Sequence, residues 1–515
     1  MYNYKHRIRI VKMGVFMTTI IQEKTQEIIN INPATGEEIS KVPISNKEQV
    51  EEIVLRAKKY FPIWSKLSLK ERARYLRKLQ KQIVQDMEEL VDTICKETGK
   101  TEMDGIVEIF TVAEHLNYII KKGPKYLKDE PRSVGIFVHK KAYVSYHPKG
   151  VVGVISPWNY PFILTAGPLA QALMAGNTVV VKPSEVTPNT TLKLREIATR
   201  AGIPEDAFLV ATGDGRTGAA LVESLNTDMI CFTGSTATGR KIAEICGRML
   251  KPVILELGGK DPMIIFEDAN LKRAVKAALW GGISNSGQTC IAVERVIVQE
   301  SIYDKFIELL KQELSQIKQG YYKDEVSVGS MAFEKQFQIV MDHINEAKQK
   351  GAQIIAGGDR NSSFVNGLFI QPTVITNVKD DMKVWKDETF GPVLAIKTFK
   401  TEEEAIEIAN KSPYGLNGSV WSKNIKRAQR VARQIKSGSI CINDVLVNYI
   451  ISDLPFGGVK ESGLGRVYSK EGLRAFTDMQ SVLVDRFNVP FELWWFPYSN
   501  KIKQLFKTFT KVLFG

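Results

Sequence analysis

The sequence has 515 residues, a length that accommodates two or three domains and a large core. Hydrophobic residues make up 44% and charged residues 25% of the chain, which is typical of a folded globular protein and argues against extensive disorder. The net charge of +13 would suit an acidic partner, but the basic residues form no compact run interleaved with aromatic residues. We therefore expect no nucleic-acid partner.

The cysteines and histidines indicate the compartment and the kind of site. The five cysteines form no CxxC pair, and an odd number of separated thiols favours a reducing, cytoplasmic environment without a disulfide framework. The five histidines do not cluster with the cysteines, so we expect no metal site. The first 20 residues are basic but lack a long apolar core, which argues against a signal peptide, and Met13 or Met17 is an alternative start.

The first predicted elements are three amphipathic helices followed by a pair of exposed strands. The helical patterns lie at 47–60, 69–95 and 104–121, and the alternating strand pattern lies at 135–148. The next segment, 151–181, carries no charge and is long enough to suggest a membrane span. Prolines and asparagines interrupt it, so we interpret it as a buried strand, a loop, a helix and a second strand.

Strands alternate with helices from this segment onward. Five β-branched runs end in polar, Gly or Pro turns, at 151–157, 177–183, 207–213, 229–235 and 252–257. Helical patterns between the runs are typical of βαβ units in a parallel sheet, and a second α/β region follows Gly258. These patterns predict an α/β protein with two doubly wound domains, in which ligands bind beyond the carboxyl ends of the strands.

The last segment, 499–515, is a separate feature. Its apolar residues recur at helical spacing, its lysines tend toward the other face, and the run WWFPY precedes it. A basic amphipathic helix with leading Trp residues can lie in a membrane interface, although the same pattern fits a helix packed on its own protein or on a partner subunit. We favour peripheral contact with the cytoplasmic face of a membrane and keep protein packing as the alternative.

Three polar residues stand where chemistry could take place. Cys290, in the small polar segment SGQTC, is a candidate nucleophile, and its alternative is a buried small hydrophobic residue. Glu256 ends a strand before two glycines and is a candidate general base, unless it caps the next helix or pairs with Lys260. Asn159 lies between two prolines and is a candidate oxyanion donor, unless it bonds its own backbone in a turn.

Seven motifs give these three residues a common context. They are SPWNYP, GNTVVVKPSEVTP, FTGSTATGR, LELGGKDP, GQTC, ETFGPV and LPFGGVKESGLGR, in that order along the chain. Through them the sequence resembles the aldehyde dehydrogenase superfamily, over nearly the whole chain from NPATGEEI to about Val484. The apolar tail is similar to that of family members that act on fatty aldehydes. The family does not use the GxGxxG fingerprint, which is absent from this chain.

The resemblance implies NAD(P)-dependent oxidation of an aldehyde to a carboxylic acid through a thiohemiacetal and a thioester. Cys290 would be the nucleophile, Glu256 the base for the deacylating water, and Asn159 with the Cys290 N–H the oxyanion hole. The cofactor-binding residues that the resemblance implies are Trp158, Lys182, Ser184, Glu185, Gly234, Ser235, Glu388 and Phe390. The Glu185 carboxylate would repel a 2′-phosphate, so NAD is favoured and NADP is the alternative cofactor.

The resemblance also implies how the chain is divided and assembled. The predicted parts are an NAD-binding domain (21–129 and 149–257), a catalytic domain (258–466), a bridging β element (130–148 and 467–486) and a C-terminal tail (487–515). A homodimer or a homotetramer is implied as the assembly.

The expected substrate tunnel includes Tyr160, Gly167 and Phe456. Many relatives that act on small aldehydes carry a bulky aromatic residue where this chain has Gly167, and the loop 446–451 is apolar. We therefore expect a long or bulky apolar aldehyde, such as a fatty or apocarotenoid aldehyde, unless Gly167 serves only close packing. The alternative functions are a semialdehyde dehydrogenase, a coenzyme A-acylating aldehyde dehydrogenase and a non-catalytic, membrane-associated homologue.

Overall fold

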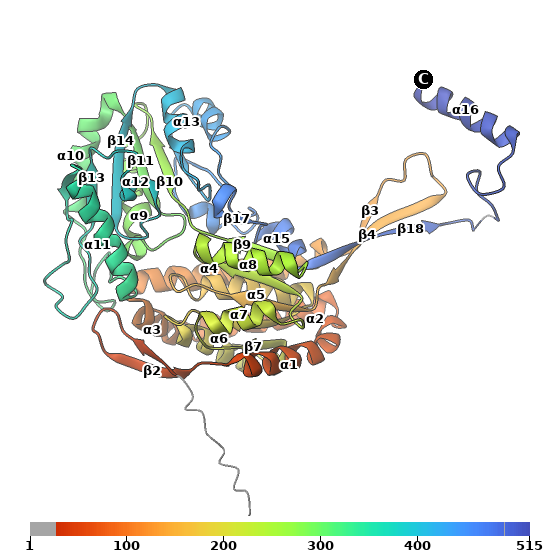
Figure 1. The fold of residues 1–515 in the computed structure, drawn as a ribbon, viewed down its shortest axis with the longest axis horizontal. Coiled ribbons are helices and arrows are strands. Elements are labelled where there is room, and N and C mark those ends of the chain that lie inside the picture. The colour runs from red at the N-terminus through yellow and green to blue at the C-terminus, as the bar shows by residue number, and fades with distance from the viewer. Residues whose placement is uncertain (1–26, 489) are drawn as a thin grey trace, which may run out of the picture.

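The computed structural model describes residues 27–488 and 490–515. The basic N-terminal stretch, its two alternative starts and the first residues of the predicted NAD-binding domain lie outside this range. The body of the molecule contains two large sheets with their helices, and a small sheet projects from it as an arm that leads to the C-terminal helix (Figure 1).

The first large sheet has six strands in the order β17-β9-β8-β5-β6-β7. They are β5 (Val151–Ile155), β6 (Thr178–Lys182), β7 (Phe208–Val210), β8 (Met229–Thr233), β9 (Val253–Glu256) and β17 (Gly463–Leu464). The strands β5 to β9 pair in parallel, whereas β17 runs antiparallel to β9. β5 and β6 are buried at every residue, as parallel strands covered on both faces require. The uncharged segment thus forms a strand, a loop, a helix and a strand, as predicted.

Eight α-helices precede β9 in the described part of the chain and pack around this sheet and one another. They are α1 (Lys47–Ser65), α2 (Leu69–Gln85), α3 (Met87–Thr98), α4 (Glu102–Tyr126), α5 (Ile163–Ala175), α6 (Pro188–Arg200), α7 (Gly215–Glu223) and α8 (Thr236–Arg248). The helix predicted at 69–95 is divided into α2 and α3, because Asp86 (φ −96°, ψ 19°) leaves helical geometry between them.

The second large sheet has seven strands in the order β12-β13-β14-β11-β10-β15-β16. They are β10 (Asp261–Ile265), β11 (Val293–Gln299), β12 (Gln353–Ala356), β13 (Thr373–Thr376), β14 (Val393–Phe399), β15 (Ser419–Trp421) and β16 (Cys441–Ile442). Its helices are α9 (Leu271–Ile283), α10 (Tyr303–Leu314), α11 (Glu334–Gln349), α12 (Lys383–Lys386), α13 (Glu402–Asn410) and α14 (Ile425–Ala432). All strand pairs except β12–β13 are parallel, so the predicted α/β class with two wound sheets is confirmed.

Two small sheets complete the described chain. One joins β1 (Glu27–Ile31) to β2 (Glu38–Pro43), and the other has the order β18-β4-β3. The strands of the second are β3 (Glu130–Arg132), β4 (Lys140–Pro148) and β18 (Thr477–Asp485), with α15 (Ser469–Ala475) just before β18. This three-stranded sheet forms the arm in Figure 1. The predicted strand pair at 135–148 is one strand, β4, and the exact limits of the predicted domains stay predictions.

The tail ends in α16 (Asn500–Phe514), which lies beyond the arm and away from the body (Figure 1). Ser499 caps this helix by accepting a hydrogen bond from the Ile502 N–H. Apolar side chains on both sides of the helix start are exposed, among them Trp495, Phe496 and Phe509. Within the described ranges, no helix combines the length and the apolar character that crossing a bilayer requires.

Candidate active site

Cys290 lies in the loop that connects α9 to β11. Three consecutive residues of this loop, Asn285, Ser286 and Gly287, have positive φ angles of 51°, 55° and 69°. Such conformations are unfavourable for residues with a side chain and concentrate at functional sites. A Cβ atom at Gly287 would overlap the backbone of Gly391, so a glycine is required at this position. The resulting tight bend places Cys290 on the wall of two cavities.

Glu256, at the end of β9, contacts Cys290 directly. The Cys290 Sγ donates a hydrogen bond to the Glu256 Oε1 at 3.2 Å. Burial raises the pKa of Glu256 to about 7. Burial, with the nearby Glu256 carboxylate, raises the pKa of the Cys290 thiol well above its ordinary value. Near neutral pH the thiol therefore keeps its proton, and Glu256 is the base next to it.

Asn159 is fixed by residues that are distant in the sequence and not by its own backbone. Its Nδ2 donates to the Gln288 carbonyl at 3.0 Å, two residues before Cys290. The main-chain carbonyl oxygen of Asn159 accepts a hydrogen bond from the Lys100 Nζ at 2.9 Å and another from the Asn285 Nδ2 at 3.1 Å. These contacts hold an amide group beside the thiol, where an oxyanion could be bound.

A buried ion pair supports the Asn159 loop. The Lys100 Nζ lies 2.5 Å from the Glu108 Oε1, and both side chains are completely buried. The other oxygen of Glu108 accepts hydrogen bonds from the N–H groups of Phe162 and Ile163 at 2.9 and 3.0 Å. Because α5 has no side-chain cap of its own, Glu108 satisfies its first N–H groups from α4. The sequence contained no local sign of this support, since the ion pair lies more than 50 positions before the loop and the helix that it holds.

Glu388 and Phe390 lie in a loop that a second buried ion pair holds. Lys260 pairs with Glu294, and not with Glu256. Glu294 accepts hydrogen bonds from the N–H groups of Thr389 and Phe390, at 2.8 and 2.9 Å. The Glu388 Oε1 in turn accepts a hydrogen bond from the Gly259 N–H at 2.8 Å. Burial, together with the nearby Glu294, raises the pKa of Glu388 to about 8.

A long cleft extends from the thiol along the carboxyl edge of the six-stranded sheet. Its inner part, about 270 Å³, is lined by Cys290, Glu256 and Asn159. Its outer part has a volume of about 600 Å³. The predicted cofactor residues that line one or both parts are Trp158, Lys182, Ser184, Glu185, Gly234, Ser235, Glu388 and Phe390. All eight are thus gathered in one cleft.

The outer part of the long cleft carries features suited to a ribose and an anionic group. The Lys182 Nζ contacts the Glu185 Oε2 at 3.1 Å, and half of the Glu185 side chain is exposed to the cleft region. Ser235 caps α8 by accepting a hydrogen bond from the Thr238 N–H at 3.3 Å. Gly234 and Ser235 therefore stand at the positive end of a helix, where the free N–H groups attract an anion.

A second cavity, the apolar channel, meets the long cleft at Leu164 and Cys290. Its volume is about 220 Å³. Its lining residues are Met103, Asp104, Val107, Thr111, Tyr160, Ile163, Leu164, Trp280, Ser284, Thr289, Cys290, Ile291, Leu446, Tyr449 and Ile450. Met103 and Trp280 are strongly exposed and mark its mouth, whereas Thr111 is buried.

Of the three predicted tunnel residues, Tyr160 alone lines the apolar channel. Phe456 does not line the channel, but its ring packs edge-on against the lining residue Tyr449, with 4.7 Å between the ring centroids. A Cβ atom at Gly167 would lie 2.5 Å from the Tyr468 hydroxyl oxygen and 3.1 Å from the Tyr468 ring. The expected widening at Gly167 is therefore corrected, because another aromatic side chain occupies that space. Tyr449 belongs to the apolar loop 446–451, which the sequence had indicated, whereas Tyr468 reaches this site from a segment that the sequence did not point to.

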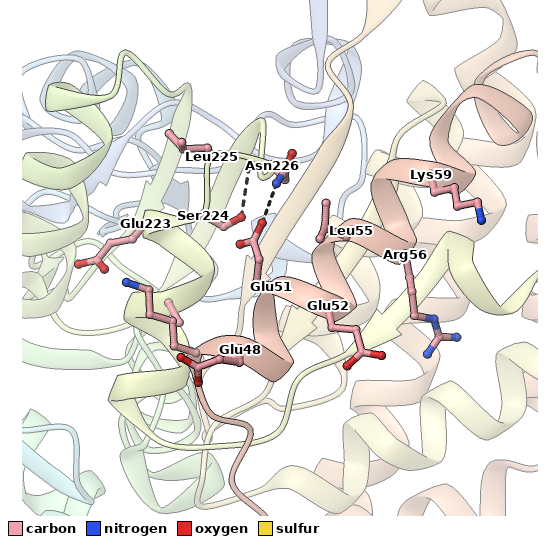
Figure 2. A pocket seen from close by; sticks show the side chains of 12 residues that line it. Glu48, Glu51, Glu52, Leu55, Arg56, Lys59, Glu223, Ser224, Leu225 and Asn226 are labelled. Atoms are coloured by element: carbon pink, nitrogen blue, oxygen red, sulfur yellow. Dashed lines mark hydrogen bonds between the residues drawn. The ribbon is translucent and has the colours of Figure 1, made fainter.

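A larger open cleft, about 800 Å³, lies outside this site, between α1 and the segment that follows α7 (Figure 2). Its walls carry mainly charged and polar side chains, such as Glu48 and Arg56, and Asn226 donates a hydrogen bond to Glu51 at 2.6 Å. None of the predicted site residues lines it.

Comparisons with known proteins agree with this geometry. The model of the aldehyde dehydrogenase family matches residues 20–482. The 4,4′-diapolycopene aldehyde oxidase of a Methylomonas species is 39% identical over 491 residues, which cover 95% of this chain and 91% of the relative. The chloroplastic betaine aldehyde dehydrogenase of Atriplex hortensis is 36% identical over 470 residues, which cover 88% of this chain and 92% of the relative.

Solved structures give the same result for the fold. The NAD-dependent aldehyde dehydrogenase from Sinorhizobium meliloti superposes with a TM-score of 0.87 at 36% identity, covering 91% of this chain and 93% of the other. A betaine aldehyde dehydrogenase variant from Staphylococcus aureus in complex with NAD+ has a TM-score of 0.87 at 34% identity, with coverage of 92% and 96%. The predicted family is confirmed, and this chain belongs to the aldehyde dehydrogenase family.

Proposed function

We propose that this protein oxidises an aldehyde to a carboxylic acid with NAD as the hydride acceptor and Cys290 as the nucleophile. The observation that carries the proposal is the position of Cys290, where the long cleft and the apolar channel meet, with its thiol bonded to Glu256. A substrate in the channel and a cofactor in the cleft would approach the same sulfur atom from their separate cavities.

The residue types support a sequence of bond changes at this thiol. Glu256 accepts the thiol proton, and the sulfur forms a bond to the aldehyde carbon. The Asn159 amide and the Cys290 N–H stabilise the oxyanion, which then expels a hydride and becomes a thioester. NAD, when bound, supplies the acceptor for that hydride. Glu256 then releases the thiol proton to solvent and takes a proton from water, whose oxygen bonds to the thioester carbon. The Cys290 sulfur leaves, regains a proton from Glu256, and the acid is released.

The residues that line the long cleft suit the ribose and phosphate groups of NAD. We propose that Lys182, Ser184 and Glu185 hold the adenosine ribose, and that Gly234 and Ser235 bind the pyrophosphate at the start of α8. Trp158, Glu388 and Phe390 would hold the nicotinamide end, next to Cys290. The exposed Glu185 carboxylate would repel a 2′-phosphate, which favours NAD, and Lys182 keeps NADP as the alternative. Among relatives, a succinate-semialdehyde dehydrogenase of Mycolicibacterium smegmatis is named for NADP+.

The apolar channel favours a long or bulky apolar aldehyde. Val107, Ile163, Leu164 and Ile450 line it, and no lysine or arginine occurs among its described lining residues. A semialdehyde enzyme would need such a cation for the distal carboxylate of its substrate. The similarity to a diapolycopene aldehyde oxidase supports a fatty or polyene aldehyde. Retention of Glu256 as a base favours release of the free acid over transfer to coenzyme A.

A cationic aldehyde is the second candidate substrate, because one acidic and three aromatic residues line the same channel. They are Asp104, Tyr160, Trp280 and Tyr449, and aromatic rings bind quaternary ammonium groups. The Asp104 Oδ2, however, already accepts a hydrogen bond from the Thr101 hydroxyl at 2.8 Å at the start of α4. Burial also raises the pKa of Asp104, which disfavours its charged form. We therefore rank the apolar aldehyde first.

The test of the substrate is the rate of NADH formation with linear aldehydes of increasing length and with betaine aldehyde. A kcat/KM that rises with chain length supports the apolar substrate. A kcat/KM that is highest for betaine aldehyde supports the cationic substrate. In that case Asp104→Asn should raise the KM for betaine aldehyde without raising the KM for the linear aldehydes. If none of these aldehydes yields NADH or NADPH, the proposed oxidation is wrong.

We further propose that the tail contacts an anionic lipid surface at the cytoplasmic face of a membrane. α16 exposes the apolar side chains of Leu505, Phe506 and Phe509 together with four lysines, a combination that suits an interface of acyl chains and anionic headgroups. Deletion of 499–515 should abolish co-sedimentation with phosphatidylserine vesicles. Unchanged sedimentation of the shortened chain would instead favour protein packing of the tail.

Assembly into a homodimer or homotetramer would use the arm. β18 is the edge strand of its sheet, and it exposes Met479 and Leu483, with 73% and 65% of each residue accessible. An exposed edge with apolar side chains is normally covered by another chain. Sedimentation equilibrium measures the assembly, and Leu483→Lys should shift it toward the monomer.

A further inference from the structure

Tyr468 fills the space beside Gly167. Its hydroxyl oxygen and ring lie 2.5 and 3.1 Å from the position where a Cβ atom at Gly167 would stand, so a side chain on α5 and the Tyr468 ring exclude each other. Tyr468 is only 3% exposed. The ring next to α5 thus comes from the segment just before α15 and not from α5 itself.

Tyr468 is linked to the wall of the apolar channel. Its hydroxyl group shares a hydrogen bond with the hydroxyl of Tyr449 at 2.8 Å, and Tyr449 lines the channel. The other side of the Tyr468 ring packs against His115, with 4.0 Å between ring centroids. The His115 Nε2 in turn contacts the Tyr449 carbonyl at 3.2 Å. Tyr449 is therefore held through both its hydroxyl and its backbone.

The helix periodicity places Tyr468 at the inner end of the channel. Thr111 on α4 and Leu164 on α5 are lining residues, and Met103 on α4 marks the mouth. One turn further into the protein, α4 presents His115, and about one turn beyond Leu164, α5 presents Gly167. The His115 ring contacts the Tyr468 ring, and a side chain at Gly167 would meet it. The channel between α4 and α5 would continue if this ring were absent.

The backbone at Tyr468 is held in an unfavourable conformation. Its φ is 61° and that of Ser469 is 57°, in a region that residues with a Cβ rarely adopt. The adjacent Val467 exchanges two backbone hydrogen bonds with Phe456, at 2.8 and 2.9 Å, which fixes the start of this turn. Strain of this kind persists where the surrounding structure determines the conformation, typically next to a functional site.

We propose that Tyr468 is a positioning residue that closes the inner end of the apolar channel and holds Tyr449 as its wall, and so determines how much bulk the aldehyde can carry next to its carbonyl carbon. The proposal rests on the proposed oxidation of an apolar aldehyde. With the inner end closed, the carbonyl group stops at Cys290 and a linear chain points toward the mouth. A ring or branch on the carbon next to the carbonyl would need the space that Tyr468 occupies.

The test compares two aldehydes with equal numbers of carbon atoms, heptanal and cyclohexanecarbaldehyde. Tyr468→Ala should raise the ratio of kcat/KM for the cyclic over the linear aldehyde by about tenfold or more, a discrimination that a changed apolar pocket typically supplies. Tyr468→Leu, which leaves a smaller void, should shift the ratio in the same direction by less. An unchanged ratio in both variants would overturn the proposal.

A reciprocal exchange separates this role from a general loss of stability. In the double variant Gly167→Phe with Tyr468→Ala, the ring returns to the same space from α5, and the wild-type ratio should be restored. If the double variant keeps the ratio of Tyr468→Ala, occupancy of that space does not determine selectivity and the proposal fails.

Binding of the matching alcohols keeps this test independent of turnover. Calorimetry should show that Tyr468→Ala binds cyclohexylmethanol more tightly relative to heptan-1-ol than the wild type does. An inactive wild type would contradict the proposed oxidation, whereas equal relative affinities in wild type and variant would contradict the role of Tyr468.

Discussion

Glu256 gives the sharpest prediction, because its protonation should control turnover near neutral pH. Burial raises its pKa from 4.5 to about 7. A carboxyl group with that pKa is ionised to about one-tenth at about pH 6 and to about nine-tenths at about pH 8. With its ordinary pKa of 4.5, the Glu256 carboxyl group would be almost completely ionised at both pH values. If the Glu256 carboxylate activates the deacylating water, the steady-state rate should rise about tenfold between these pH values and level off above them.

The assay separates the two chemical stages. Rapid mixing of enzyme, NAD and aldehyde shows a first burst of NADH, which reports formation of the thioester, followed by a steady rate that reports its hydrolysis. Glu256→Gln should lower the steady rate strongly and remove its dependence on pH near 7. Glu48→Gln, a matched change in the open cleft of Figure 2, should leave both stages and their pH dependence unchanged.

Two results would refute the reasoning about Glu256. One is a steady rate that stays constant from about pH 6 to 8 while hydrolysis limits turnover, since the carboxyl would then have its ordinary pKa. The other is a Glu256→Gln variant that releases acid at the wild-type rate, since no other described base contacts the Cys290 thiol.

Three further predictions concern the same site. Cys290→Ala should abolish NADH formation while calorimetry still detects NAD binding. Lys100→Met should lower the melting temperature, because losing one partner of a buried ion pair costs about 3–5 kcal/mol, and adding Glu108→Gln should recover part of the loss. Glu256→Gln should raise the melting temperature relative to the wild type at about pH 8, where the folded state buries a carboxylate that the unfolded state keeps in water. It should not do so at about pH 4, below both the unfolded and the folded pKa. An equal difference between variant and wild type at both pH values would contradict the raised pKa.

Regular patterns in the sequence predicted the fold and the centre of the site. The β-branched runs became the parallel strands of the first sheet, and the uncharged segment was correctly divided into strand, loop, helix and strand. Cys290, Glu256 and Asn159 follow or end such elements, and the structure brings all three to one cavity. Periodicity sufficed for the strands and helices. The three site residues each kept an alternative on local sequence alone, and the resemblance to the family decided between them.

Contacts between distant segments could not be predicted in the same way. A glycine in place of an aromatic residue suggests a wider tunnel, yet Tyr468 approaches Gly167 from about 300 positions further along the chain. Similarly, the division at Asp86 depends on the backbone angles of one residue inside an otherwise continuous helical pattern. In each case the deciding partner or angle lies outside the window that a periodicity can report.

Four glutamates at the site divide into two kinds, according to whether a buried lysine pairs with them. Glu108 and Glu294 each have a buried lysine partner and accept hydrogen bonds from backbone N–H groups, so their charge holds a loop in place. Glu256 and Glu388 line the long cleft, and no ion-pair partner is recorded for either in the described part of the chain.

Burial without an ion-pair partner raises the pKa of Glu256 to about 7, and burial with the nearby Glu294 raises the pKa of Glu388 to about 8. A carboxyl group in that range can gain or lose a proton at neutral pH, as a base in a catalytic cycle must. Glu256 and Glu388 are also the two glutamates that the sequence placed in the site, whereas it did not indicate Glu108 and Glu294. The paired carboxylates fix the loops that carry Asn159 and Phe390, and this leaves the unpaired ones free to exchange protons with the reacting groups.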